Sequence, residues 1–353
     1  MPNASLSRAR PSARSGESTL ERLLDEARGF SAEFPLFLAN HQPMMLVALE
    51  RLGASDRRLE EWFDVYRDVS RLVPQPPSVA KIGRADWRSH LGDRSRERDY
   101  RDFFTGEVAH LGIAPAVAAY MPTLTPGIAG SALHSFMRLS YGVMRNDPAE
   151  VGAALGYWSA AYLELCLASG AEPVTGDPAK VLLGMKPVEA YRHVEPELDL
   201  LWHFMREMAR KPEFRGVVDQ LRIGPDSLRC VAEASLALYA GTMDFCALHA
   251  LTGSHWLRLL WPVLPDADLA LRYFWQAIAA LYPKIGFPDL PSAEQLDEWR
   301  HAPAPDWPEI RAAAIACDDE HDISLTFSAF EQWKFYRDPL YKFVAARRVR
   351  LIA

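Results

Sequence analysis

The sequence has few cysteines, no long apolar run and almost no signal for β-strands. The four cysteines are widely spaced and form no CxxC pair, which favours reduced thiols over a disulfide framework or a zinc knuckle. No stretch reaches 18 consecutive apolar residues, so no transmembrane helix is expected. No alternating β-branched run is bounded by Asn-Gly or Asp-Gly turns, so little of the chain is expected in sheets. The cysteines are Cys166, Cys230, Cys246 and Cys317.

A basic surface is also missing. The net charge is −7, and no Lys/Arg run is interleaved with aromatic residues, which argues against nucleic acid as a partner. The first 18 residues contain three arginines and five serines but no apolar core of the kind that a signal peptide needs. We therefore predict a disordered tail over 1–18 and a cytoplasmic protein that does not bind membranes.

Helical periodicity dominates the rest of the chain. The stretch STLERLLDEARGF has a serine cap, a glutamate three residues later and leucines on one face, which is typical of a helix start. Most of the 26 prolines lie between such periodic segments, and no repeat or composition shift divides the chain. The sequence predicts an all-α fold, with one large multi-helix domain over 19–353. Further helical periods cover 148–169, 194–210, 226–250, 266–282, 307–317 and 325–350.

Two histidines flank a Thr-Gly pair in the stretch ALHALTGSHWLR. On one unbroken helix, six residues turn through about 600°, so His249 and His255 would point to nearly opposite faces. If the Thr-Gly pair ends one helix and the next serine caps another, the chain bends and both imidazoles converge. We expect this bend, with Asp244 as a candidate to hold the far ring nitrogen of a metal-binding histidine. The spacing matches no standard metal motif, so a structural role for the pair stays open.

Two more histidines lie at helical positions with apolar neighbours. His41, in FLANHQPMMLVALERLGAS, precedes Pro43, which is tolerated in the first turn of a helix, so the helix should begin near 41–43. His134, in GSALHSFMRLSYGVMR, shares a helix face with Arg138 and Tyr141. Each histidine is either a neutral metal ligand or a hydrogen-bonded core residue.

The other histidines give weaker signals. His321, in CDDEHDISLTF, follows three acids at what the pattern predicts to be a helix start, and it is the reserve candidate. A surface or structural role is expected for His90, His110, His193, His203 and His301.

Six segments together resemble the questin oxidase-like family, which includes fungal enzymes that open the anthraquinone ring in polyketide pathways and many bacterial members. They occur in the family's order and with similar spacing, from about residue 20 to 348. The segments are LANHQPMMLVALERLGA, DWRSHLGDRSRERDYRDFF, ALHSFMRLSYG, LHALTGSHWLR, DDEHDIS and DPLY.

The resemblance implies an oxygenase that acts on a polycyclic aromatic or quinone-type substrate with O2, by Baeyer-Villiger-like insertion or by dioxygenase cleavage. It also implies a buried pocket lined by four histidines that bind non-haem Fe(II). By motif these are His41, His134, His249 and His255. Four neutral imidazoles are a plausible donor set for a divalent metal. Arg138, Tyr141 and Arg258 are then candidates to orient or polarise a substrate oxygen.

One position departs from the family pattern. Where family members often carry a lysine three residues after the histidine of the DEH segment, this chain has Ser324. Serine cannot replace such a ligand, and four neutral imidazoles leave the metal's charge uncompensated. Asp318, Asp319, Asp322 or an exogenous anion would have to supply the negative charge.

Two other functions stay open. One is a metal-free aromatic-ligand binder or acid/base catalyst on the same fold, which the Ser324 departure favours. The other is a zinc-dependent hydrolase, or an interaction protein with structural histidines. Fungal members use reduced nicotinamide, but PGIAGSALH lacks the strand-and-helix context of a dinucleotide motif. We therefore expect any NADPH to act as an external reductant, and a homodimer is compatible with the size of the chain.

Overall fold

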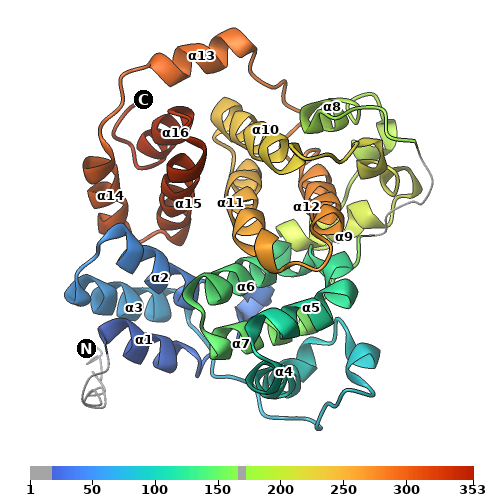
Figure 1. Cartoon of the computed structure of the whole chain (residues 1–353), viewed down its shortest axis with the longest axis vertical. Coiled ribbons are helices and arrows are strands. Elements are labelled where there is room, and N and C mark those ends of the chain that lie inside the picture. The colour runs from blue at the N-terminus through green and yellow to red at the C-terminus, as the bar shows by residue number, and fades with distance from the viewer. Residues whose placement is uncertain (1–17, 166–171) are drawn as a thin grey trace, which may run out of the picture.

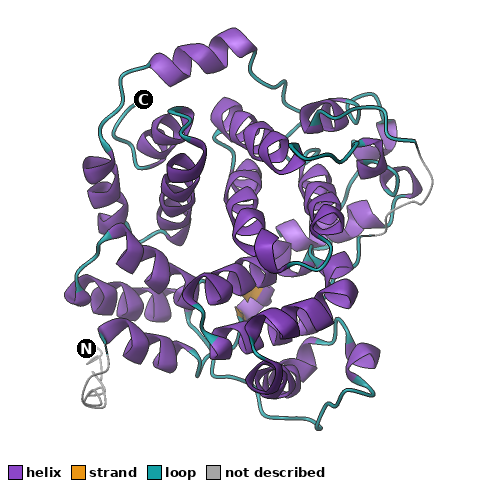
Figure 2. Ribbon diagram, viewed as in Figure 1, coloured by secondary structure: helices purple, strands orange, loops and turns teal. Residues whose placement is uncertain are grey.

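The computed structural model describes residues 18–165 and 172–353, and helices make up most of these residues, as the predicted all-α class requires (Figure 2). The α-helices are α1 (Thr19–Ala27), α2 (Gln42–Leu52), α3 (Asp56–Ser70), α4 (Glu97–Leu111), α5 (Ile113–Leu124), α6 (His134–Arg145), α7 (Pro148–Ala160), α8 (Pro178–Leu183), α9 (Leu201–Ala209), α10 (Ser227–Thr242), α11 (Phe245–Leu260), α12 (Ala267–Leu281), α13 (Ala293–His301), α14 (Trp307–Ala316), α15 (Glu320–Tyr336) and α16 (Leu340–Arg348). The 3-10 helices are η1 (Pro35–Phe37), η2 (Trp87–His90), η3 (Arg94–Arg96), η4 (Thr125–Gly127), η5 (Gly130–Leu133), η6 (Glu189–Tyr191), η7 (Pro212–Phe214), η8 (Val218–Gln220) and η9 (Trp261–Val263).

The strands form one short antiparallel pair, β1 (Glu33–Phe34) and β2 (Leu38–Ala39), which η1 connects. Ser18 caps α1, and its capping box with Glu21 is present as predicted. Apart from Ser18, the predicted tail lies outside the described residues, as does Cys166.

Two predicted helices are each divided in the structure. The periodic segment 226–250 is interrupted between α10 and α11 at Met243, which adopts φ 49°, and Asp244 caps the new helix. The segment 325–350 is divided between α15 and α16 at Arg337, which adopts φ 62°. Left-handed residues of this kind end helices, but no glycine marks either position in the sequence.

The predicted bend at 252–253 is wrong, because α11 runs unbroken through it. A Cβ atom added at Gly253 would lie 2.4 Å from the ring of Phe274 on α12. Gly253 therefore allows the close approach of an aromatic side chain from a neighbouring helix. It does not end its own helix.

The described helices divide into two groups (Figure 1). The N-terminal helices α1 to α7 occupy the lower part of the view, and α10, α11, α12, α15 and α16 occupy the upper part. At the boundary α11 packs on α6 and α15 packs on α2. A continuous set of buried apolar side chains, from Leu20 to Ala346, spans both groups.

Two expectations from composition can be compared with this fold. Cys230, Cys246 and Cys317, the cysteines among the described residues, are free thiols, as expected. None of the helices in the described parts of the chain combines the length and the apolarity that crossing a bilayer requires.

Candidate functional site

Four histidines gather where the two groups of helices meet. His41 immediately precedes α2, His134 is the first residue of α6, His249 lies near the start of α11, and His321 is the second residue of α15. All four line one cavity of about 380 Å³. Each group of helices therefore contributes two imidazoles to this cavity.

His41 and His134 are the closest pair, with their Nε2 atoms 2.9 Å apart. His321 flanks His41, with ring centroids 5.2 Å apart, and His249 flanks His134 at 5.7 Å. In the described part of the chain, one group of three histidine or acidic side chains has its donor atoms all within 4.8 Å of one another. It consists of Asp319, Glu320 and His321.

The hydrogen bonds of the four rings define their tautomers. Each Nδ1 lies next to an oxygen that can only accept a hydrogen bond. The acceptors are Ala39 O for His41 (3.0 Å), Ser131 O for His134 (2.6 Å), Phe245 O for His249 (3.0 Å) and Asp319 Oδ1 for His321 (3.1 Å). Nδ1 must therefore carry the hydrogen, and each neutral ring keeps a lone pair on Nε2.

Burial keeps three of these rings neutral. It lowers the pKa of His41 well below the usual range, and the neighbouring His134 and His321 rings lower it further. Burial lowers the pKa of His134 to about 4 and that of His249 to about 3. The helix N-termini act in the same direction, because their positive ends disfavour an imidazolium. At neutral pH these rings are bases with free electron pairs.

The segment before α6 has an unusual backbone. Ser131, Ala132 and Leu133 adopt positive φ values of 49°, 51° and 73° in succession. Three consecutive left-handed residues without glycine are strained. The strain positions Ser131 O as the acceptor for His134, and the Ser131 hydroxyl accepts a 2.6 Å hydrogen bond from Tyr157. Backbone strain next to a buried histidine cluster is typical of a functional site.

We expect Ala132→Gly to stabilise the protein by up to about 1 kcal/mol, because glycine relieves a left-handed strain of about that size. Ala129→Gly is the matched control, because Ala129 is equally buried but has a right-handed backbone, with φ −71°. It should destabilise the protein by about 0.5–1 kcal/mol. Urea unfolding measures both, and equal losses of stability in the two variants would contradict the assignment of strain.

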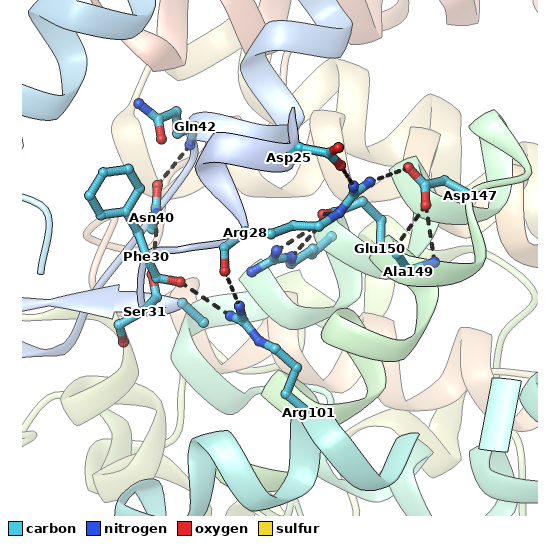
Figure 3. Close-up of polar contacts among 12 residues, drawn as sticks. Asp25, Arg28, Phe30, Ser31, Asn40, Gln42, Arg101, Asp147, Ala149 and Glu150 are labelled. Atoms are coloured by element: carbon cyan, nitrogen blue, oxygen red, sulfur yellow. Dashed lines mark hydrogen bonds and ion pairs between the residues drawn. The ribbon is translucent and has the colours of Figure 1, made fainter. Parts of the chain in front are cut away.

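A polar network behind the cavity holds the segment that carries His41 (Figure 3). The Asn40 side chain donates to Ser31 O at 3.0 Å and accepts from the backbone N–H of Gln42 at 2.9 Å. In the turn before this segment, the Arg101 guanidinium donates to the backbone carbonyl oxygens of Arg28 (2.7 Å) and Phe30 (3.3 Å). Residues on both sides of His41 are thereby anchored.

The remaining wall of the cavity is mainly apolar and includes four aromatic side chains. Phe34 and Phe37 come from the strand pair and its connection, Trp202 comes from α9, and Phe245 comes from α11. Phe37, 48% exposed, packs edge-on against Trp202, and the Arg94 guanidinium lies 5.0 Å from the first ring and 4.5 Å from the second. A flat apolar ligand would find aromatic faces on several sides and imidazoles at the base.

His255, predicted to be a fourth ligand, is not brought to the cavity. Because α11 is continuous, its ring points away from His249, contacts the Ser328 hydroxyl at 3.1 Å and packs against Phe327. Its Nε2 atom is buried and has no partner among the described residues. Asp244 does not hold a histidine ring, because its carboxylate caps α11 at Cys246 N.

The three predicted substrate-orienting residues also lie away from the cavity. Arg138 pairs with the buried Glu150 at 3.0 Å, Tyr141 packs against Phe327, and Arg258 donates to Gln332 at 2.6 Å. Arg138 and Tyr141 do share a face of α6 with the cavity histidine. They lie about 6 and 10 Å further along the axis, whereas the cavity is at the start of the helix.

Sequence reasoning kept His321 only in reserve and did not name Glu320, which also lines the cavity. The available signal was their position at a helix start after two aspartates, which resembles the positions of His41 and His134. The resemblance of LHALTGSHWLR to the family motif favoured His255 instead.

The chain was compared with models of protein families. The model of the questin oxidase-like family matches residues 38–326, which include all four cavity histidines and His255. No curated protein matches the chain significantly. Because the family match covers most of the sequence, the chain belongs to the questin oxidase-like family.

Proposed function

We propose that this protein is a non-haem iron-dependent oxygenase that oxidises a polycyclic aromatic or quinone-type substrate in the histidine cavity. One observation carries the proposal: four imidazoles from four helices, three of them buried, line one cavity, and each has its Nδ1 hydrogen bonded to an oxygen acceptor. This is the usual outer-shell arrangement of metal-binding histidines. Family membership supports an oxidase acting on anthraquinone-type compounds.

The donor set fits a divalent metal. Two Nε2 lone pairs face each other at 2.9 Å with no hydrogen between them, which is repulsive unless a cation lies close to both. Two adjacent nitrogen ligands at about 2.1 Å from one metal, at right angles, lie about 3 Å apart. His41 and His134 therefore already have a separation suited to one ion. In the proposed set His249 and His321 complete the ligands, and His321 takes the place expected for His255.

Bound iron would supply activation of O2 next to the substrate. Burial holds His41, His134 and His249 neutral, so that no proton competes for their Nε2 atoms at neutral pH, and their backbone acceptors direct the ring hydrogen to Nδ1. The aromatic wall excludes water and orients a planar ring system against the histidine end of the cavity. The ion pair of Lys284 with Asp199 at the cavity wall provides polar groups for substituents on the ring.

Metal content of single-histidine variants tests the proposal. After anaerobic loading with Fe(II), the wild type should hold about one iron per chain, and His249→Ala and His321→Ala should lose it. His255→Ala is the discriminating control, since its ring lies outside the cavity, and this variant should keep its iron. Elemental analysis gives the count, and circular dichroism confirms the fold.

Equal iron in all four proteins would contradict the assignment of ligands. Iron-free wild-type protein would favour the metal-free binder, and zinc without O2 consumption would favour a hydrolase.

A further inference from the structure

A divalent ion held by four neutral imidazoles would carry a net charge of +2 in a buried site. Such a charge is costly unless a carboxylate or another anion compensates it. The usual iron site with two histidines includes a carboxylate for this reason. The following inference rests on the proposed metal site and concerns the origin of that negative charge.

Three acids next to the site are already engaged elsewhere. Asp318 pairs with Arg58 at 2.9 Å and is mainly exposed. Asp319 caps α15 at the backbone N–H of His321 and also accepts from its ring. Asp322 is bound to Arg348 at 2.5 Å. None of the three lines the histidine cavity.

Glu320 differs from these three acids both in its position and in its partners. Its side chain lines the cavity, is 24% exposed, and forms no ion pair with lysine or arginine among the described residues. One carboxylate oxygen lies 3.9 Å from His41 Nδ1 and 3.8 Å from His321 Nδ1. It is therefore next to two of the four imidazoles, and of these four acids it is the one that lines the cavity.

We propose that Glu320 is the carboxylate that compensates the charge of the metal in the histidine cavity. It takes over the role that the sequence left unfilled at Ser324, and it does so from the start of α15, where the positive end of a helix favours a negative charge.

Binding of Co(II), used as an oxygen-stable probe, tests this role by calorimetry without any substrate. Glu320→Gln removes the charge and keeps the shape, so it should weaken Co(II) binding at least about tenfold. Asp318→Asn removes a charge two residues away that does not line the cavity, and it should leave the affinity within about twofold. Thermal unfolding of the metal-free variants should be similar to that of the wild type.

A second variant separates a charge effect from a packing effect. Glu320→Ala leaves space for a small anion, so added formate should restore part of the lost Co(II) affinity, whereas chloride at equal ionic strength should not. Unchanged affinity in Glu320→Gln, or a loss in Glu320→Ala that formate does not restore, would overturn the role of Glu320 while the histidine site stands. A wild type that does not bind Co(II) would overturn both proposals.

Discussion

Between about pH 6.5 and pH 4.5 the metal-free protein is expected to lose most of its stability. Burial lowers the pKa values of His41, His134, His249 and His255 in the folded state, whereas an unfolded histidine titrates near pH 6.5. In this window the unfolded chain binds protons that the folded chain cannot. The stability is fully present above about pH 6.5, and each histidine removes about 1.4 kcal/mol per pH unit below it.

Four such groups together would remove about 5 kcal/mol per pH unit, which is comparable with the whole stability of a typical domain. Urea unfolding at a series of pH values, with a chelator present, measures this slope, which is the change in the free energy of unfolding per pH unit. His255→Leu removes one buried titrating group outside the cavity and should make the slope shallower by about a quarter. A urea midpoint that stays constant across this range would disprove the coupling.

Glu150→Gln should destabilise the protein by about 3–5 kcal/mol. The carboxylate is buried and receives Arg138 at 3.0 Å and Arg28 at 2.9 Å, with Arg101 close by (Figure 3). Burial raises the pKa of Glu150, but the three guanidinium groups outweigh burial and hold that pKa below its usual range. Without the charge, the buried guanidinium of Arg138 would have no anionic partner, which costs more than the lost hydrogen bonds.

Chemical unfolding near neutral pH measures this loss. Because the pKa of Glu150 is lowered, its contribution is present above about pH 4.3 and is lost only on further acidification, so it does not distort the histidine window. Glu61→Gln is the control, since Glu61 pairs with Arg57 on the exposed surface and should cost less than about 1 kcal/mol. A loss in Glu150→Gln as small as that of the control would show that the arginine network is unimportant for stability.

The all-α fold class could be predicted from the sequence, because apolar periodicity and helix-capping residues are local signals. Ser18, for example, forms the predicted capping box. The sequence did not identify every histidine of the cluster. A glycine such as Gly253 can either end a helix or make room for a side chain from a neighbouring helix. Only the position of Phe274, on another helix, decides between these two roles. His249 was therefore assigned to the cavity while its predicted partner His255 lies on the other side of α11.

The roles of the charged residues depended even more on tertiary contacts. Arg138 is close to His134 in sequence and on the same helix face, but its partner Glu150 comes from α7. Of the acids near His321, the three that the sequence suggested are engaged in caps and ion pairs, and Glu320 is the one in the cavity. A local pattern shows that acids are present, but it does not show which of them already have partners.

The positions of the cavity histidines along the chain also restrict when the proposed metal could bind. They lie at residues 41, 134, 249 and 321, so joining any two of them closes a loop of many tens of residues. A metal ion therefore cannot nucleate folding, as it does in a zinc finger whose ligands are close in sequence. During synthesis the complete donor set does not exist until the ribosome has passed residue 321. Loading of the proposed metal would accordingly be a late step, on a chain that its apolar core has already folded.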